Sequence, residues 1–230
     1  MRVKNMNKVD AFKPKPKHTI ITREGYPFIA IGLVLTILAY AFGLILLAIV
    51  FAVLTIFVCA FFRNPKREPN EKFDENSIFS PADGKVIAIE KIKNDLLIKG
   101  PALKVSIFMS VFNCHVNRSP IKGLVENVFY NKGRFFVASL DKASVHNERN
   151  TVILLDEKGR KLVLVQIAGF IARRIVSYLR EGFKIERGAR LGVIRFGSRV
   201  DLYFPDNSVQ LNVGLNAQVR AGKTIVGRWQ

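Results

Sequence analysis

Cysteine and histidine are both scarce in this chain of 230 residues, which narrows the chemistry open to it. The two cysteines, Cys59 and Cys114, provide neither a disulfide framework nor the spacing of a zinc site, and this weakly favours a reducing compartment. We therefore expect no metal cofactor. Imidazole chemistry, if the protein uses it, must come from His18, His115 or His146.

Acidic residues are also few: 18 aspartates and glutamates stand against 36 lysines and arginines, so the net charge is +18. Such an excess attracts polyanions, either nucleic acid or an anionic bilayer. Hydrophobic residues make up 49% of the chain, which excludes a purely disordered basic tail. Part of the charge lies in residues 1–26, where Pro14 and Pro16 discourage a helix. We expect a flexible basic arm there.

Charged side chains are missing altogether from residues 27–62. A single helix of that length would extend for about 54 Å, whereas the hydrocarbon core of a bilayer is about 30 Å thick. We therefore predict two short helices, broken near residues 41–43, in a membrane-associated hairpin that crosses the bilayer or re-enters it. Basic residues on both flanks place both ends on the cytoplasmic face of the cell membrane. The alternative is a helix pair buried in a soluble protein.

Residues 63–77 form a polar linker, and from residue 78 onward short β-rich segments replace the apolar run. Glycine-containing turns separate these segments. Seven strands are predicted, at residues 86–89, 103–109, 125–130, 152–155, 162–167, 192–196 and 200–204. Residues 171–179 fit either a strand or a short helix. Because no long helix intervenes, we predict a mainly β (α+β) fold, with an antiparallel domain over 78–230 preceded by the N-terminal helical hairpin.

The dipeptide Gly197-Ser198 lies between the last two predicted strands. A serine hydroxyl can attack the carbonyl of the preceding residue and turn the amide into an ester, and glycine leaves that carbonyl unshielded. If a base then removes the serine α-proton, elimination breaks the chain. The dehydroalanine that remains hydrolyses to a pyruvoyl group, a cofactor made from the backbone. The alternative for Gly-Ser is an ordinary turn between two strands.

Asp83 and His115 are the candidate acid and base for such chemistry. Asp83 occupies an Asp-Gly turn before a strand, where a carboxylate can orient a histidine by accepting its N–H, although good turn chemistry alone also accounts for it. His115 follows an apolar strand in a polar loop, where functional residues concentrate. His146 and His18 are weaker candidates. Sequence spacing does not show whether Asp83 and His115 meet Ser198.

The chain contains, in this order, Ser80-Pro-Ala-Asp-Gly-Lys, Phe112-Asn-Cys-His-Val-Asn-Arg-Ser-Pro, Asn147-Glu-Arg-Asn, Gly169-Phe-Ile-Ala-Arg-Arg-Ile-Val and Arg195-Phe-Gly-Ser-Arg-Val-Asp. Together these motifs, which fall within residues 25–210, resemble the short bacterial and archaeal form of the phosphatidylserine decarboxylase family. The resemblance implies a proenzyme that cuts itself between Gly197 and Ser198. Its β chain would be residues 1–197. Its α chain, residues 198–230, would begin with the pyruvoyl group, and the two chains would form a heterodimer.

The resemblance also implies the reaction. Phosphatidylserine in an anionic membrane would form a Schiff base with the pyruvoyl group, lose carbon dioxide and give phosphatidylethanolamine. Asp83 and His115 would activate Ser198, and His115 would later return a proton to the substrate. Longer family members carry two close histidines in this region, whereas this chain has Arg118 three residues after His115. Whether His115 serves both steps is therefore open.

Three arginines, Arg118, Arg134 and Arg199, are candidate partners for the phosphate or carboxylate of the lipid, although surface arginines are usually only solvated. A state of assembly beyond the heterodimer is left open. The alternative function is a non-catalytic, membrane-anchored adaptor with a lipoyl-like β-sandwich. Nucleic acid is not an expected partner, because the basic residues flank the apolar run and no aromatic-studded basic strand is present.

Overall fold

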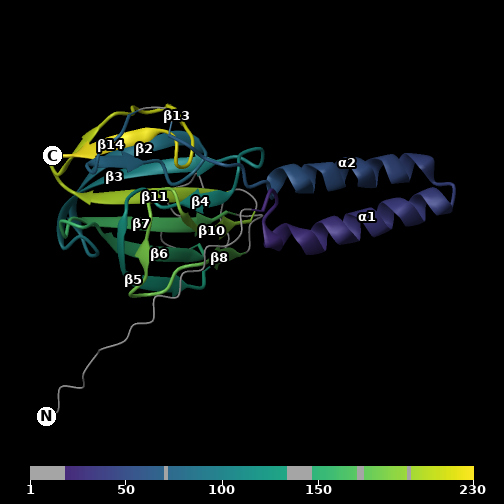
Figure 1. Cartoon of the computed structure of the whole chain (residues 1–230), viewed down its shortest axis with the longest axis horizontal. Helices are drawn as coiled ribbons and strands as arrows, with labels where there is room; N and C mark the ends of the chain where they lie inside the picture. The colour runs from purple at the N-terminus through teal and green to yellow at the C-terminus, as the bar shows by residue number, and fades with distance from the viewer. Residues whose placement is uncertain (1–18, 70–71, 134–146, 170–173, 196–197) are drawn as a thin grey trace, which may run out of the picture.

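The computed structural model describes residues 19–69, 72–133, 147–169, 174–195 and 198–230, which form a β-rich body with a helical hairpin projecting from one side (Figure 1). The hairpin begins with a 3-10 turn, η1 (Arg23–Gly25), and continues as α1 (Tyr26–Ala41) and α2 (Ile45–Phe61). Gly43 has a φ of 74° between the two helices, a conformation that favours glycine. The predicted break near residues 41–43 is confirmed.

Apolar side chains cover the outside of this hairpin. Leu46 and Phe42, near its tip, expose 82% and 77% of their surface. Among the described residues, one helical stretch, Arg23–Ala41, is long and apolar enough to cross a membrane by length and composition. Soluble monomers rarely expose an apolar surface of this extent. The exposure therefore argues against the alternative of a helix pair buried in a soluble fold.

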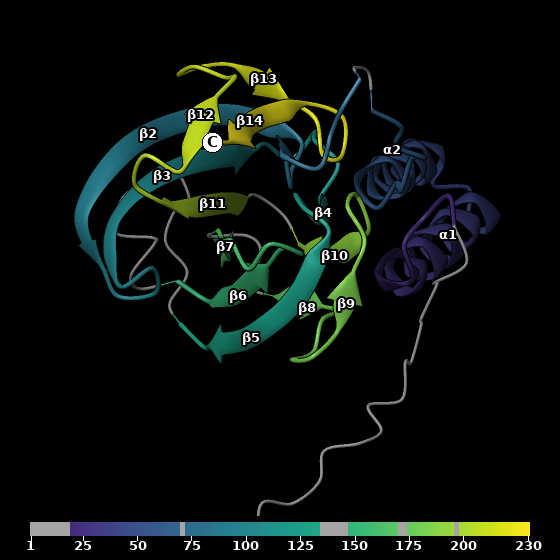
Figure 2. The same ribbon diagram turned by 60° about the vertical axis from the view of Figure 1, so that its left-hand side comes forward.

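The body is built on one antiparallel sheet that curls around the core (Figures 1 and 2). Its strand order is β13-β2-β3-β11-β7-β6-β5-β9. The strands are β2 (Gly84–Asp95), β3 (Gly100–Met109), β5 (Gly123–Asn131), β6 (Arg149–Leu155), β7 (Lys161–Ala168), β9 (Lys184–Ile185), β11 (Ser198–Pro205) and β13 (Gln218–Val219). β11 therefore lies near the middle of the sheet, between β3 and β7.

Two smaller antiparallel sheets complete the body. The first has the order β1-β14-β12 and the second has the order β4-β10-β8. Their strands are β1 (Ser77–Phe79), β4 (Val116–Arg118), β8 (Ile175–Ser177), β10 (Arg190–Ile194), β12 (Val209–Leu211) and β14 (Ile225–Trp229). The second sheet lies toward the base of the hairpin (Figure 1).

Alternation along β11 separates the two faces of the large sheet. Val200, Leu202 and Phe204 point into the main core, where they pack with residues of both smaller sheets. Tyr203 points the other way, into a second apolar cluster that includes Val165 of β7. Because successive side chains of a strand point to opposite faces, Ser198 lies on the core face and Arg199 on the other.

The predicted fold class is confirmed: the chain is mainly antiparallel β, with a helical pair at its N-terminal end. All seven predicted strands are present. Seven further strands are present among the described residues: β8 lies where a strand was one of two predicted alternatives, and the other six, β1, β4, β9, β12, β13 and β14, were not predicted. Each is only two to five residues long, too short to show a clear alternation. Within the ambiguous stretch 171–179, residues 175–177 form β8, and residues 170–173 lie outside the described residues.

Candidate active site

Ser198 is the first residue of β11 and is fully buried. Its neighbours across the sheet are Met109, the last residue of β3, and Ala168, the last residue of β7. The Ser198 hydroxyl lies 3.4 Å from the Met109 sulfur. Gly197, the other half of the predicted cleavage site, lies outside the described residues. The serine is therefore held at the end of a central strand, in an environment closed to bulk water.

A row of buried amides runs through the core toward this serine. Asn150 donates to Gln166 at 2.9 Å, and Gln166 donates to Asn117 at 2.8 Å. Asn117 in turn directs its amide at the Met109 sulfur, 3.6 Å away, which is the atom that the Ser198 hydroxyl also contacts. All three amide residues are fully buried. Sequence reasoning missed this network, because amides in separate motifs give no sign of meeting.

His115 lies in the loop between β3 and β4, buried beneath the end of α2. Its Nδ1 is 3.0 Å from the carbonyl oxygen of Asn113. Because a carbonyl can only accept, Nδ1 carries the proton and Nε2 keeps its lone pair. Nε2 is buried without a hydrogen-bond partner among the described residues. Burial lowers the pKa of His115 to about 4, with the charge of Arg63 adding to this effect, so the ring is a neutral base at pH 7.

The backbone connects His115 to the segment that leads into Ser198. Ile194, at the end of β10, donates its N–H to the His115 carbonyl at 3.3 Å. Ser198 itself pairs with Met109, which ends the strand before the His115 loop. The loop between β3 and β4 therefore lies beside the end of β10 and the start of β11. The structure brings His115 and Ser198 to the same end of the sheet.

Asp83 does not make the contact expected of it. One oxygen of its buried carboxylate accepts from Arg67 at 2.5 Å, and the other accepts from the backbone N–H of Ala221 at 2.8 Å. The N–H of His115 goes instead to a backbone carbonyl, that of Asn113. No hydrogen bond joins Asp83 to His115 within the described part of the chain. Asp83 therefore holds the turn before β2, and its carboxylate binds Arg67 and the backbone of Ala221.

The candidate arginines are engaged elsewhere. Arg118 donates to the carbonyl of Gly188 at 2.9 Å and to Asn64 and the carbonyl of Pro65 at 3.0 Å each. Burial lowers the pKa of Arg118. Arg199 is buried on the opposite face of β11 from Ser198 and pairs with Asp201 through two hydrogen bonds of 2.7 Å. Arg134 lies outside the described residues. Arg118 and Arg199 therefore both have protein partners among the described residues.

The predicted linker, residues 63–77, is not a free tether at its start. Asn64 is buried and donates to the carbonyl of Thr19 at 2.9 Å, and Ile21 forms a bridge with Arg63. The end of the predicted flexible arm is therefore tied to the hairpin exit, and residues 1–18 lie outside the described residues.

Cys114, beside His115, directs its thiol to the Arg63 carbonyl at 3.2 Å. The chain leaving the hairpin is thus part of the site.

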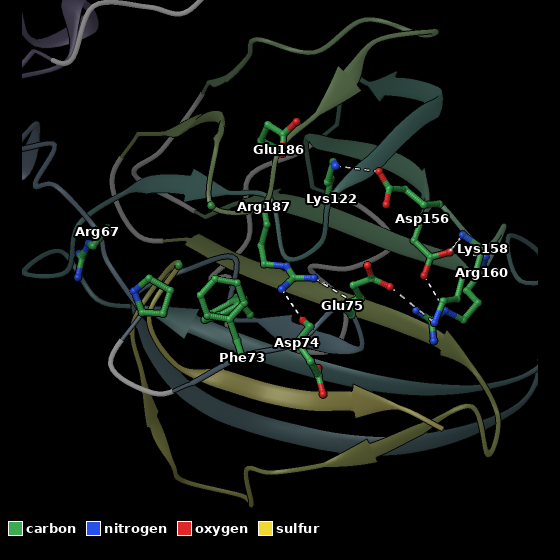
Figure 3. A pocket seen from close by; sticks show the side chains of 15 residues that line it. Arg67, Phe73, Asp74, Glu75, Lys122, Asp156, Lys158, Arg160, Glu186 and Arg187 are labelled. Atoms are coloured by element: carbon green, nitrogen blue, oxygen red, sulfur yellow. Dashed lines mark hydrogen bonds and ion pairs between the residues drawn. The ribbon is translucent and has the colours of Figure 1, made fainter.

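A cleft of about 530 Å³ opens on another part of the body (Figure 3). Arg187 crosses it, with its guanidinium over the rings of Phe73 and Phe79 and its N–H groups donating to the carbonyls of Asp74 and Glu75. Neither Ser198 nor His115 lines this cleft. The described residues also contain no group of three or more histidine, cysteine, aspartate or glutamate side chains placed to hold a metal. The cleft therefore adjoins the candidate site through Arg67, the partner of Asp83, but does not contain its serine or histidine.

Comparisons with known proteins agree with the arrangement of motifs. The family model described as phosphatidylserine decarboxylase matches residues 54–227. A protein of Desulfotalea psychrophila is 45% identical over 208 residues, which cover 90% of this chain and 96% of that protein. One from Syntrophotalea carbinolica is 46% identical over 204 residues, covering 89% and 94%. One from Burkholderia mallei is 47% identical over 210 residues, covering 91% and 95%. All three are named phosphatidylserine decarboxylase proenzyme. The chain therefore belongs to the phosphatidylserine decarboxylase family.

Proposed function

We propose that this protein is a pyruvoyl-dependent phosphatidylserine decarboxylase, a carboxy-lyase made as a proenzyme. The observation that carries the proposal is the position of Ser198, buried at the start of the central strand β11, directly after the glycine of the Gly-Ser dipeptide. The relatives named as phosphatidylserine decarboxylase proenzymes, which align with nearly the whole chain, support the same reading.

Self-cleavage begins with the hydroxyl of Ser198. A base takes the hydroxyl proton while the oxygen attacks the Gly197 carbonyl, and the amide becomes an ester with a free amine. Removal of the Ser198 α-proton then expels the Gly197 carboxylate and leaves a dehydroalanine. Water hydrolyses this group to a pyruvoyl group and ammonia. His115 suits the first proton transfer, since its Nε2 is neutral, buried and without another partner among the described residues.

The residues around Ser198 fit the group that would replace it. A pyruvoyl group keeps the three carbons of serine, so it occupies the same buried position beside Met109 and Asn117 without added bulk. Once formed, the group supplies an electron sink for the loss of carbon dioxide from an amino-acid headgroup. The chain's own part is to exclude water and to move a proton. We assign this transfer to Nε2 of His115, which is neutral at rest and is the acceptor left free by the hydrogen bond of Nδ1.

The hairpin accounts for how such an enzyme meets its substrate. Its exposed apolar side chains enter the cytoplasmic leaflet of the cell membrane, and Phe61 at the end of α2 stacks on His115 of the candidate site. Phosphatidylserine, an anionic lipid, would reach the site from that leaflet without leaving the membrane. The net charge of +18 favours such a surface. Two chains, 1–197 and 198–230, would remain together as a heterodimer through the shared sheet.

The test is mass spectrometry of the purified protein, together with decarboxylase activity on vesicles that contain phosphatidylserine. Wild-type protein is expected to yield a fragment of residues 198–230 blocked by a pyruvoyl group, and Ser198→Ala is expected to stay uncut and inactive. Arg118, Arg134 and Arg199 remain proposed headgroup ligands, and replacing each with alanine in the same vesicle assay tests them. Uncut but folded wild-type protein would contradict the proposal and favour the membrane-anchored adaptor.

A further inference from the structure

The exit of the hairpin, residues 61–67, makes side-chain contacts with both His115 and Asp83. Phe61 ends α2 and stacks on the ring of His115. Six residues later, Arg67 pairs with Asp83. Between them, Asn64 accepts a hydrogen bond from Arg118 at 3.0 Å. A membrane anchor that only tethers the domain needs no such contacts.

The stack of Phe61 on His115 closes one face of the imidazole. The ring centroids are 4.2 Å apart, and the planes differ by 29°. Each of the two residues exposes only 1% of its surface. Phe61 also contacts Phe62 edge-on and Phe57 at a tilt, so its ring is fixed by the helix to which it belongs. The orientation and the water exclusion of His115 therefore depend on where α2 ends.

The pair of Arg67 and Asp83 fixes the turn between β1 and β2. The side chains are 9% and 10% exposed, so the pair is largely desolvated and each charge needs the other. The same turn presents the carbonyl of Pro81, which accepts from the backbone of Arg118 at 2.9 Å and from the Asn117 amide at 3.4 Å. Asn117 is the last amide in the row that leads to Ser198. A displacement of Asp83 would therefore move the Pro81 carbonyl and, through it, the Asn117 amide that contacts Met109.

We propose that Phe61 and Arg67 are positioning residues that couple the seating of the membrane hairpin to self-cleavage at Ser198. The proposal rests on the proposed function. Its consequence is that the proenzyme matures efficiently only when the hairpin exit is docked on the loops that contain Asp83 and His115. Self-cleavage at Ser198 then follows the folding of the membrane hairpin, and the proenzyme is not processed before this anchor is in place.

The first test measures the rate of self-cleavage in a timed cell-free synthesis with lipid vesicles. Arg67→Ala is compared with Lys66→Ala, because Lys66 is the exposed neighbour and both changes remove one positive charge. We expect Arg67→Ala to slow cleavage by ~10-fold or more, the scale of a displaced catalytic group. Lys66→Ala is expected to cleave at the wild-type rate. Arg67→Lys, which keeps the charge but not the planar fork, is expected to recover part of the loss.

The second test reads the pH dependence of cleavage in Phe61→Ala and in Phe51→Ala, a matched change higher on α2. The charged and titratable groups around His115 are Arg63 from the hairpin exit and Cys114 from its own loop. Cleavage needs neutral His115, so the wild-type rate should fall only as pH drops through about 4. Opening the ring to water in Phe61→Ala should raise this midpoint toward ~6.5. Phe51→Ala should leave it unchanged.

Folding is checked by near-ultraviolet circular dichroism of each variant in the uncleavable Ser198→Ala background. If Phe61→Ala fails to fold, Phe61→Leu, which keeps the apolar volume but not the stack, takes its place. Folded Arg67 and Phe61 variants that cleave like their controls, with an unmoved pH midpoint, would overturn the inference. Failure of the wild type and of Lys66→Ala to cleave would instead refute the proposed function.

Discussion

At the scale of single residues, Ser198 has a weak hydrogen-bond partner. Within the described residues its hydroxyl contacts only the Met109 sulfur, at 3.4 Å. A thioether is a poor acceptor, so the hydroxyl is buried without being locked into a strong hydrogen bond. A hydroxyl in this state is free to turn toward the carbonyl of the preceding residue. This is the freedom that attack on a neighbouring peptide bond requires.

The buried pair of Arg199 and Asp201 supports a structural role for Arg199, whereas the sequence suggested that this arginine binds the lipid headgroup. Asp201 is fully buried and takes both of its hydrogen bonds from this guanidinium. We expect Arg199→Met to lower the free energy of unfolding by about 3–5 kcal/mol, because it leaves a buried carboxylate without its partner. Urea unfolding of the Ser198→Ala precursor in detergent measures this change.

The double variant Arg199→Met/Asp201→Leu separates structure from substrate binding. Removing both charges is expected to restore most of the stability, since apolar pairs of similar volume often replace buried ion pairs. It is also expected to restore self-cleavage and decarboxylation. A double variant that is stable and cleaved, yet unable to decarboxylate phosphatidylserine, would make Arg199 a headgroup ligand after all.

At the scale of elements, the two helices of the hairpin meet at Gly32. A Cβ at this position would lie 2.3 Å from the Thr55 hydroxyl oxygen, which itself donates to the Phe51 carbonyl at 2.7 Å. In an open helix, replacing glycine with alanine stabilises by about 1 kcal/mol. Here we expect Gly32→Ala to destabilise the hairpin by ~1–3 kcal/mol, because the helices must separate. Thermal unfolding in detergent micelles checks the sign.

The compensating change is Thr55→Ala, which removes the atoms that meet the new methyl group. Gly32→Ala/Thr55→Ala is expected to unfold at or above the wild-type temperature. If Gly32→Ala alone raises the unfolding temperature, the close contact between α1 and α2 does not exist in solution.

The strand β11 is the element that joins the two proposed chains. It starts at Ser198, yet it lies between β3 and β7, which belong to the part of the chain before the cleavage site. Eight residue pairs with β3 and six with β7 surround it on both sides. Cutting the peptide before Ser198 therefore leaves the sheet intact. The proposed heterodimer is held together by strand pairing that already exists in the uncut chain.

At the scale of the whole molecule, the length of the hairpin limits how deeply it inserts. The helices contain 16 and 17 residues, so each rises for about 24–26 Å, less than the ~30 Å hydrocarbon core. Both helices join the body at the same end (Figure 1). The tip carries Tyr40, Phe42 and Leu44 as exposed side chains and no charge. With η1 included, Arg23–Ala41 is long enough to cross, whereas α2 is not, so the length of α2 and the uncharged tip are the features that favour re-entry.

The depth of the tip can be measured with a tryptophan at position 42. In a Trp229→Phe background, Phe42→Trp is expected to be quenched most strongly by lipids brominated deep in their acyl chains. Tyr26→Trp, at the exposed base of α1, is the matched control and should be quenched by bromines near the headgroup. Strong shallow quenching at position 42 would place the tip across the bilayer and contradict re-entry.

The sequence by itself determined the parts of this protein that depend on neighbouring residues. The uncharged run of residues 27–62 predicted the hairpin and its break, since transfer into lipid depends on local composition. Short β-rich runs separated by turn residues predicted seven of the strands and hence the mainly β fold. The motifs around Asp83, His115 and Ser198 predicted the family. Short strands such as β9 and β13 gave no such signal, because their two residues acquire a strand conformation only by pairing.

Only the tertiary structure decided which partner each polar group takes. Asp83 meets Arg67, sixteen residues away, and Arg118 meets Asn64 across 54 residues, while His115 turns its N–H to a backbone carbonyl. Hydrogen bonds and ion pairs require two groups within about 3 Å of each other. Residues far apart in the sequence come this close only when the core packs. The types of residue that carry the chemistry are therefore visible in the sequence. Their protonation, burial and partners come from the fold.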